Sequence, residues 1–175
     1  MLRLKILKNT FDKNHTYDNA VGIMCLLVPG RIMKQSSNII VTNNQVRENN
    51  HVNFSAPPEM ESVLPSGIGI LLVGIDDALV SDNHVTDNKF TGIALVSTLI
   101  IGSLANLPPA AFGDIEPNPD RARIIANKVQ HNGFNPPSGF PLPGVDLLWD
   151  GSGNDNCWKN NVFSTSFPSP LPACQ

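Results

Sequence analysis

The sequence has few charged residues: Asp, Glu, Lys and Arg make up 15% of its 175 residues, and the formal net charge is -3. Its 12 Lys and Arg residues are scattered, so no basic stripe points to a nucleic-acid partner. Long apolar runs are missing too, because the most apolar window, residues 92–107, is short and contains polar side chains. A membrane-spanning helix needs roughly 20 apolar residues, so none is expected.

The sequence also lacks the short motifs of several common chemistries. It has no Gly-rich phosphate loop, no nucleophile elbow and no paired CxxC, and its 4 His residues follow no metal-ligand spacing. No metal site and no cofactor are therefore expected. Runs of the helix formers Ala, Glu and Lys are scarce, whereas Asn, Gly and Pro are abundant, which favours short strands joined by turns.

An internal repeat organises what is present. Its unit has an anchor Asn, an apolar residue three before it, an apolar residue two after it, and a second Asn five after it. Four copies fit, and a fifth ends in Ser166 instead of Asn. The anchors are Asn9, Asn44, Asn83, Asn127 and Asn161, which lie 35, 39, 44 and 34 residues apart.

A second element follows each of the first four copies, namely a Gly that opens an apolar strand. These glycines are Gly22, Gly69, Gly92 and Gly144, and the interval from Gly69 to Gly92 is 23 residues, about one turn of a β-helix. The two elements together predict an all-β fold, a right-handed parallel β-helix solenoid of roughly five coils. Equivalent residues then stack about 4.8 Å apart, so that Ile6, Val41, Val80 and Ile124 form one core column and the anchor asparagines form a hydrogen-bonded ladder.

The two ends of the chain carry further expectations. No secretory signal is recognisable over residues 1–5, where the repeat has already begun, so we expect a C-terminal portion of a longer protein whose export signal lies upstream. Residues 1–163 are assigned to the solenoid and residues 164–175, rich in Pro, to a capping tail. A Cys157–Cys174 disulfide would fasten that tail and imply an oxidising compartment, whereas Cys25 is expected to pack as a small apolar residue.

Three Pro-rich loops interrupt the repeat, at residues 52–66, 98–120 and 133–143. The first and third leave at the same point of the repeat, on either side of the short linker 89–91. They are expected to form the walls of a groove, which is where a solenoid places a binding site. The alternative is that the loops merely cover the sheet.

One set of side chains is a candidate binding site. Asp146 is predicted to face solvent near Trp149, Asp150, His131 and Phe140, and carboxylates beside an exposed aromatic suit sugar or calcium binding. The alternative is a polar last coil in which Trp149 shields the end of the core. The adjacent Asp76 and Asp77 lie where the repeat places a turn, as do Asn38 and Asp155, so turn formation is their expected role.

The chain resembles bacterial right-handed parallel β-helix repeat proteins with the pectin-lyase-like fold, and it matches their C-terminal portion. The segments that carry the resemblance are 38–44 (NIIVTNN), 65–71 (PSGIGIL), 146–154 (DLLWDGSGN) and the ending from 156–158 (NCW) to 171–174 (LPAC). The resemblance implies the fold and a location in the cell envelope or outside the cell, but no reaction. The Asp-Pro-His-Asp-type motif of alginate epimerases and the Gly-His-Gly and Arg-x-Lys motifs of polygalacturonases are absent.

Three functions fit these features. The favoured one is a carbohydrate-interacting β-helix domain outside the cytoplasm. The others are a polysaccharide lyase or epimerase acting on acidic glycans around Asp146 and Asp150, and a structural surface spacer. The unpaired strand edge of the first coil further predicts a tendency to self-associate.

Overall fold

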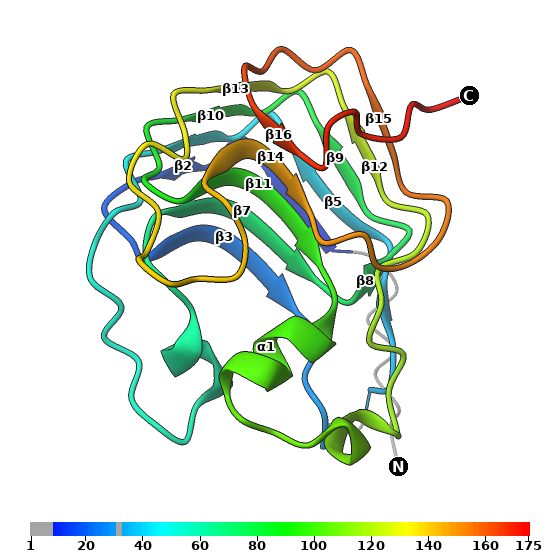
Figure 1. Cartoon of the computed structure of the whole chain (residues 1–175). Coiled ribbons are helices and arrows are strands. Elements are labelled where there is room, and N and C mark those ends of the chain that lie inside the picture. Colours follow the sequence, from blue (N-terminus) through cyan, green and yellow to red (C-terminus); the bar gives the residue numbers. More distant parts are fainter. Residues whose placement is uncertain (1–8, 31–32) are drawn as a thin grey trace.

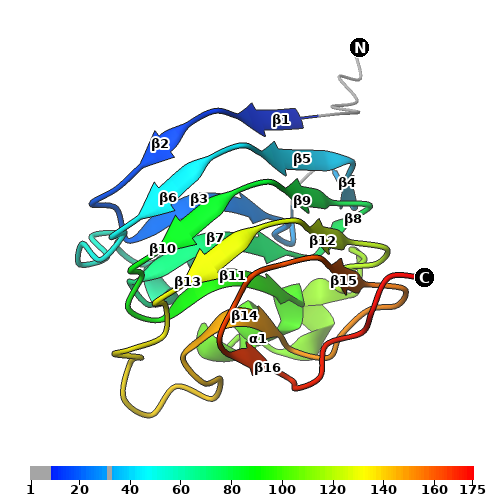
Figure 2. The ribbon, with the colours of Figure 1, turned by 90° about the horizontal axis from the view of Figure 1, so that it is seen from above.

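Short parallel strands are the main regular secondary structure in the computed structural model, which describes residues 9–30 and 33–175. Each of the first four circuits of the chain adds one strand to each of three sheets, so the sheets run side by side along a solenoid (Figures 1 and 2). The predicted right-handed parallel β-helix is thus confirmed.

The first sheet contains β1 (Asn9–Asp12), β5 (Ile39–Thr42), β9 (Leu79–Ser81), β12 (Arg123–Ile125) and β15 (Cys157–Lys159). The second contains β2 (His15–Thr16), β6 (Gln45–Arg47), β10 (His84–Thr86) and β13 (Lys128–Gln130). The third contains β3 (Val21–Leu26), β7 (Ile68–Val73), β11 (Thr91–Val96), β14 (Val145–Trp149) and β16 (Ser166–Phe167). Two shorter strands, β4 (Ser36–Ser37) and β8 (Ile75–Asp76), pair with each other.

Inward apolar columns hold the coils together. Val41, Val80 and Ile124 lie in register in adjacent strands, and each is fully buried. Ile6, which was expected to begin this column, lies outside the described residues, and Phe11 pairs with Val41 in the first coil. Because each strand buries its inner side chains against those of the next coil, no single coil has a core of its own.

The anchor asparagines form the predicted ladder, with one correction in the first coil. The side-chain amide of Asn44 donates to Asn83 Oδ1, that of Asn83 to Asn127 and that of Asn127 to Asn161, at 2.9–3.0 Å. The first rung is Asn14, which donates to Asn44 Oδ1 at 2.9 Å, and not Asn9, which pairs with Ile39 in the strand.

The spacing within the repeat explains why the predicted register of the first coil was wrong. Asn14 and Asn19 are five residues apart, as are Asn44 and Asn49, so Asn14 also fits as the second Asn of a unit that begins at Asn9. In the true register the inward position two residues after the anchor holds Thr16, opposite Val46, and this polar residue hides the match.

The second Asn of each unit forms a parallel ladder beside the first. Asn19, Asn49 and Asn88 donate in turn to the side-chain oxygens of Asn49, Asn88 and Asn132, at 3.0, 3.3 and 2.9 Å. Three of the repeat's glycines, Gly22, Gly69 and Gly92, lie against this ladder. A Cβ on Gly92 would stand 2.4 Å from Val129 Cγ1 and 2.9 Å from Asn132 Nδ2. Only Gly fits there because those distances are shorter than any normal carbon contact.

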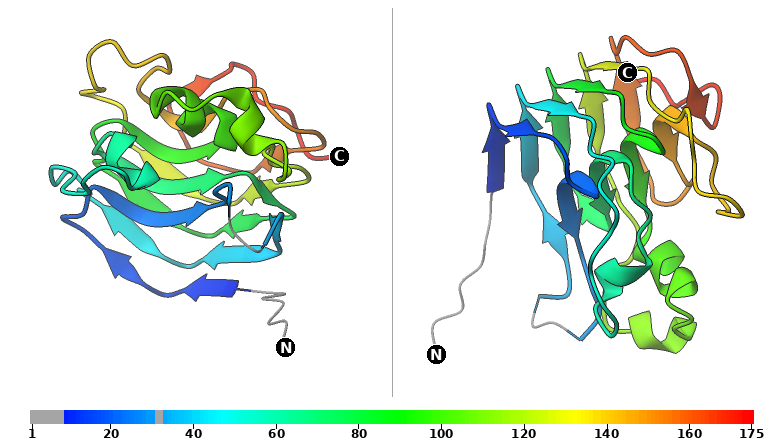
Figure 3. Two further views of the ribbon diagram at one scale, coloured as in Figure 1. Left: turned by 90° about the horizontal axis from the view of Figure 1, so that it is seen from below. Right: turned by 90° about the vertical axis from the view of Figure 1, so that its left-hand side faces the viewer.

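The outer face of the third sheet is covered by the Pro-rich loops. These contain a 3-10 helix at Met60–Val63 (η1), the helix α1 (Thr98–Leu104) and a second 3-10 helix at Pro109–Phe112 (η2). Figure 3 shows the helical segments lying over this sheet. Outward residues of β7, β11 and β14, such as Leu71, Ala94 and Leu148, are buried beneath them in a second apolar cluster. No described helix has the length and apolar character to cross a membrane.

The chain ends in a tail that closes the last coil. Cys157 and Cys174 form a disulfide, and the main-chain N–H of Trp158 donates to Pro172 at 2.8 Å. The tail is not free of strand pairing despite its prolines, because β16 pairs with β14. Cys25 is a free thiol buried in the core, and burial raises its pKa to about 11.

Candidate functional site

Asp146 does not face solvent, contrary to the sequence-based expectation, since its exposed fraction is 1%. Thr91 pairs with Val145 and Ile93 with Leu147, so Asp146 occupies the place held by Gly92 in the coil before. The alignment was wrong by two residues, because Gly144 was matched with the glycines of the earlier coils.

Asp146 completes the second Asn ladder. Its Oδ1 accepts the main-chain N–H and the side-chain amide of Asn132, both at 3.0 Å, as an Asn of a further coil would. Its Oδ2 accepts the main-chain N–H of Ser164 at 2.9 Å and of Thr165 at 3.1 Å. Both oxygens are therefore committed to the fold, which removes Asp146 from a ligand-binding or catalytic role.

The other members of the predicted set do not form one site either. Trp149 packs on Trp158 with ring centroids 5.5 Å apart, and its indole N–H donates to the Ser152 carbonyl at 2.8 Å. Asp150 is committed to loop contacts, because it accepts the Ser97 N–H at 2.7 Å and the Ser152 N–H at 3.0 Å.

The predicted groove between the first and third loops is filled. Phe90, from the short linker, is buried and meets Phe140 of the third loop edge to face, with centroids 5.0 Å apart. The cavity left beneath them is about 20 Å³ and is lined by apolar residues, including Leu64 and Leu148. His131 lies elsewhere, exposed on a turn with its Nδ1 4.0 Å from an Asp87 carboxylate oxygen. At this point the loops cover the sheet.

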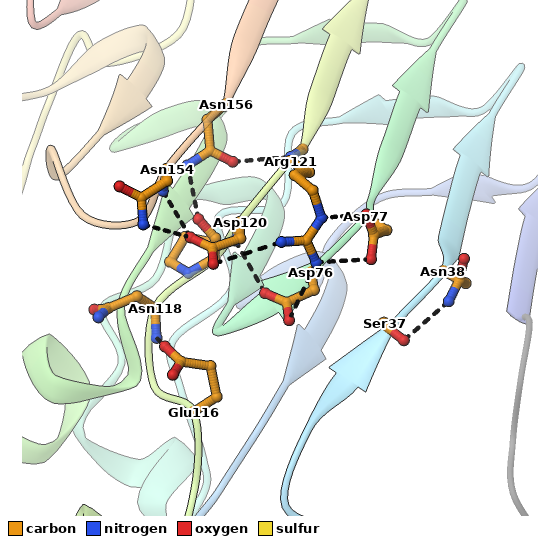
Figure 4. Close-up of polar contacts among 12 residues, drawn as sticks. Ser37, Asn38, Asp76, Asp77, Glu116, Asn118, Asp120, Arg121, Asn154 and Asn156 are labelled. Atoms are coloured by element: carbon orange, nitrogen blue, oxygen red, sulfur yellow. Dashed lines mark hydrogen bonds and ion pairs between the residues drawn. The ribbon is translucent and has the colours of Figure 1, made fainter.

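A polar column runs along the turns before the first sheet (Figure 4). Asn38, Asp77 and Asp155 have positive φ angles of 60°, 50° and 57°, which is the turn role expected of them. Arg121 occupies the same position in its coil, with φ of 58°. Its guanidinium binds both oxygens of Asp77, at 2.7 and 3.0 Å.

Arg121 also lies 3.7 Å from Asp76 and 3.6 Å from Asp120, so one cation serves three carboxylates. Its hydrogen bonds hold the pKa of Asp77 below the usual value, whereas burial raises the pKa of Asp76. Arg121 thus fills the place that a bound cation would take. No group of three or more His, Cys, Asp or Glu side chains in residues 9–30 and 33–175 is arranged to hold a metal ion.

An open groove lies instead beside β3, at the edge of the third sheet. The loops cover the sheet's other long strands, but Val21, Met24 and Leu26 of β3 are only half-buried. Three hollows of about 240, 360 and 280 Å³ lie between β3, the segment that follows it and the first loop. Glu61 contributes to the lining of all three. We call these hollows together the β3 groove.

The β3 groove combines an aromatic ring with uncommitted polar groups. Phe54 stands in it with 85% of its surface exposed. No described residue donates a hydrogen bond to the carboxylate of Glu61, and the side chains of Ser55 and Gln35 have no hydrogen-bond partner among the described residues either. Asn53 fixes this wall, since its amide donates to the Glu61 and Leu64 carbonyls, each at 2.8 Å.

Sequence reasoning missed Glu61 and Phe54 although it placed them in a Pro-rich loop. The only signal was the position of that loop beside a repeat whose outer strand face is apolar. The groove has two walls from segments about 35 residues apart, so its existence depends on packing that no local pattern encodes.

Comparison with known proteins gives one match. A family model described as right handed beta helix region matches residues 3–100, more than half of the chain. No curated protein and no solved structure matches significantly.

Proposed function

Because the chain belongs to the right-handed β-helix family, we propose that it is a carbohydrate-binding β-helix domain that holds a glycan in the β3 groove. The observation that carries the proposal is the exposed Phe54 beside Glu61, whose carboxylate is not bonded by any described residue. An aromatic ring gives a flat apolar surface for the C–H face of a sugar, and a carboxylate accepts hydrogen bonds from its hydroxyls.

The composition of the groove supports a sugar better than an apolar ligand. Its half-buried apolar floor at Val21 and Met24 is bordered by hydroxyl, amide and carboxylate groups from both walls, including Ser36 and Ser55. Pockets that recognise small polar ligands share this pattern of an apolar surface with a few polar groups that set orientation. A surface spacer would need no such groove.

Lyase or epimerase chemistry has less support. Asp146 and Asp150, on which that alternative rested, are both committed to structural hydrogen bonds. The two acidic residues beside the groove, Glu59 and Glu61, come from one loop, and no described Lys or Arg lines the groove as a base. We therefore propose binding without catalysis.

A glycan array followed by calorimetry on the best ligand tests the proposal. Phe54→Ala removes the aromatic surface and is expected to weaken binding roughly tenfold, equivalent to about 1.4 kcal/mol. Glu61→Gln replaces the charged acceptor and should weaken binding by a similar factor.

Phe134→Ala is the matched control. Phe134 is 60% exposed on the third loop and does not line the groove, so its removal should leave affinity unchanged. The proposal fails if the array shows no ligand, or if a ligand binds the Phe54 and Glu61 variants as well as the unchanged protein.

We further propose a location outside the cytoplasm, which the Cys157–Cys174 disulfide supports because such bonds persist in oxidising compartments.

We also propose weak self-association through β1, β2 and β3, each of which lies at the end of its sheet among the described strands. Light scattering at rising concentration tests it, and a constant monomer mass would reject it.

A further inference from the structure

The C-terminal end of the solenoid has a hollow of its own, which we call the cap pocket. Its volume is about 270 Å³, and it lies between the last coil and the tail. One wall is formed by residues from Trp158 to Phe163, and the other by Leu171 and its neighbours in the tail. The cap pocket shares no lining residue with the β3 groove.

Four polar side chains around the cap pocket have no hydrogen-bond partner among the described residues, whereas that of Asn161 is held in the ladder. The side chain of Asn160 makes no hydrogen bond to a described residue, although it lies next to the ladder residue Asn161. The hydroxyls of Ser166 and Ser169 and the ammonium group of Lys159 are likewise unbonded within residues 9–30 and 33–175. Four hydrogen-bonding groups are thus available to a ligand at one hollow.

The charge and the apolar wall of the pocket indicate its ligand. Lys159 is the one charged residue among those described as lining it, so the pocket favours an anionic group. The two hydroxyls and the Asn160 amide can bond both hydroxyls and carboxylate oxygens. Phe163, 41% exposed, and Leu171 provide the apolar surface on which a ring can rest.

We propose that the cap pocket is a second binding site, separate from the β3 groove, for a sugar acid: a ring that carries hydroxyl groups and one carboxylate. Lys159 pairs with the carboxylate, the serine hydroxyls and the Asn160 amide bind ring hydroxyls, and Phe163 contacts the ring face. The site does not depend on the proposed function of the groove.

One wall of this site, the tail, depends on the disulfide being formed. The tail is held on the last coil by the Cys157–Cys174 bond and by the N–H of Cys174, which donates to the Trp158 carbonyl at 3.2 Å. Leu171 lies within this closed loop, so it is positioned by the bond. Reduction is therefore expected to loosen the wall and to weaken ligand binding while the coils stay folded.

Titration of the full chain with galacturonate, followed by the NMR signals of its backbone amides, tests the proposal. Saturable shifts are expected at residues 158–171, and galactose, which lacks the carboxylate, should bind at least ten times more weakly. Lys159→Met should reduce the affinity for galacturonate to that for galactose. Asn160→Gly, which keeps the positive φ of 55° accessible, should weaken both sugars.

Lys128→Met is the matched control, because Lys128 is also an exposed lysine, on β13 and outside the pocket, and its loss should change nothing. The proposal is overturned if galacturonate causes no saturable shift at the cap, if galactose binds as tightly, or if Lys159→Met binds galacturonate normally. Unchanged binding after verified reduction of the disulfide would show that the tail wall does not depend on this bond.

Discussion

Removal of the Asp146 carboxylate should destabilise the fold although Asp146 touches no ligand. In Asp146→Ala the main-chain N–H of Asn132, a residue only 8% exposed, loses its acceptor. A buried donor left unpaired costs about 1–3 kcal/mol. Ser164 and Thr165 are exposed, so water replaces part of what their N–H groups lose. We expect a total loss of about 3 kcal/mol, because bonds to a charged group are stronger than neutral ones.

Thermal and urea unfolding measure this loss. For a chain of this size a destabilisation of about 3 kcal/mol lowers Tm by roughly 6–12 °C. Asp146→Asn keeps one acceptor oxygen but points an amide at two N–H groups. Its loss of stability should therefore lie between those of the unchanged protein and Asp146→Ala. Asp155→Asn is the control, since Asp155 is exposed and its carboxylate is not bonded by any described residue.

Hydrogen exchange adds a local measurement, because the Asn132 amide should lose protection in Asp146→Ala before the inner strands do. The reasoning would be refuted if Asp146→Ala changed the free energy of unfolding by less than about 0.5 kcal/mol, which is the effect of an ordinary surface substitution.

Three further perturbations follow from the same structure. Gly92→Ala should destabilise the fold by at least about 3 kcal/mol in urea unfolding, since its Cβ would stand 2.4 Å from a core methyl. Gly113→Ala is the control and should be nearly neutral, because the nearest neighbour of its Cβ is an oxygen at 3.5 Å. Asp77→Asn should be less stable than the unchanged protein at pH 7. Because Arg121 lowers the folded-state pKa of Asp77 below 3.8, this difference should vanish in acid titration as the pH falls through that lowered value, and a pH-independent difference would contradict it. Cys174→Ser should cost about 3 kcal/mol by the loop-closure relation, seen as a lower Tm without added reductant, and an unchanged Tm would show that the tail contributes nothing.

The coils could be predicted because stacking forces the sequence to repeat. Val41, Val80 and Ile124 must each fill the same position in a shared core, so their residue type recurs at equivalent places. The register of the first coil could not be fixed in the same way. A unit that contains two Asn five residues apart matches itself when shifted by five, and Thr16 weakened the correct alignment.

Features that join distant segments were beyond the sequence pattern. Phe140 closes the expected groove on Phe90, 50 residues earlier, and Arg121 meets Asp77 across 44 residues. Such contacts become visible only when the coil register and the path of each loop are known. Asp146 shows this most clearly. An alignment error of two residues predicted a solvent-facing, ligand-binding carboxylate where the structure has the buried end of a ladder.

The asparagine ladders have a polarity, since each side-chain oxygen of the inner coils accepts from the Asn of the preceding coil. The amide nitrogen donates to the Asn of the following coil and also to a main-chain carbonyl of the preceding one. The two ends of the molecule are therefore chemically unequal. At the first coil Asn14 and Asn19 present oxygens, so two molecules that met through their first coils would oppose acceptor to acceptor. A dimer formed there gains no hydrogen bond between these oxygens, so it depends on backbone strand pairing and on the N–H groups that the first coil presents.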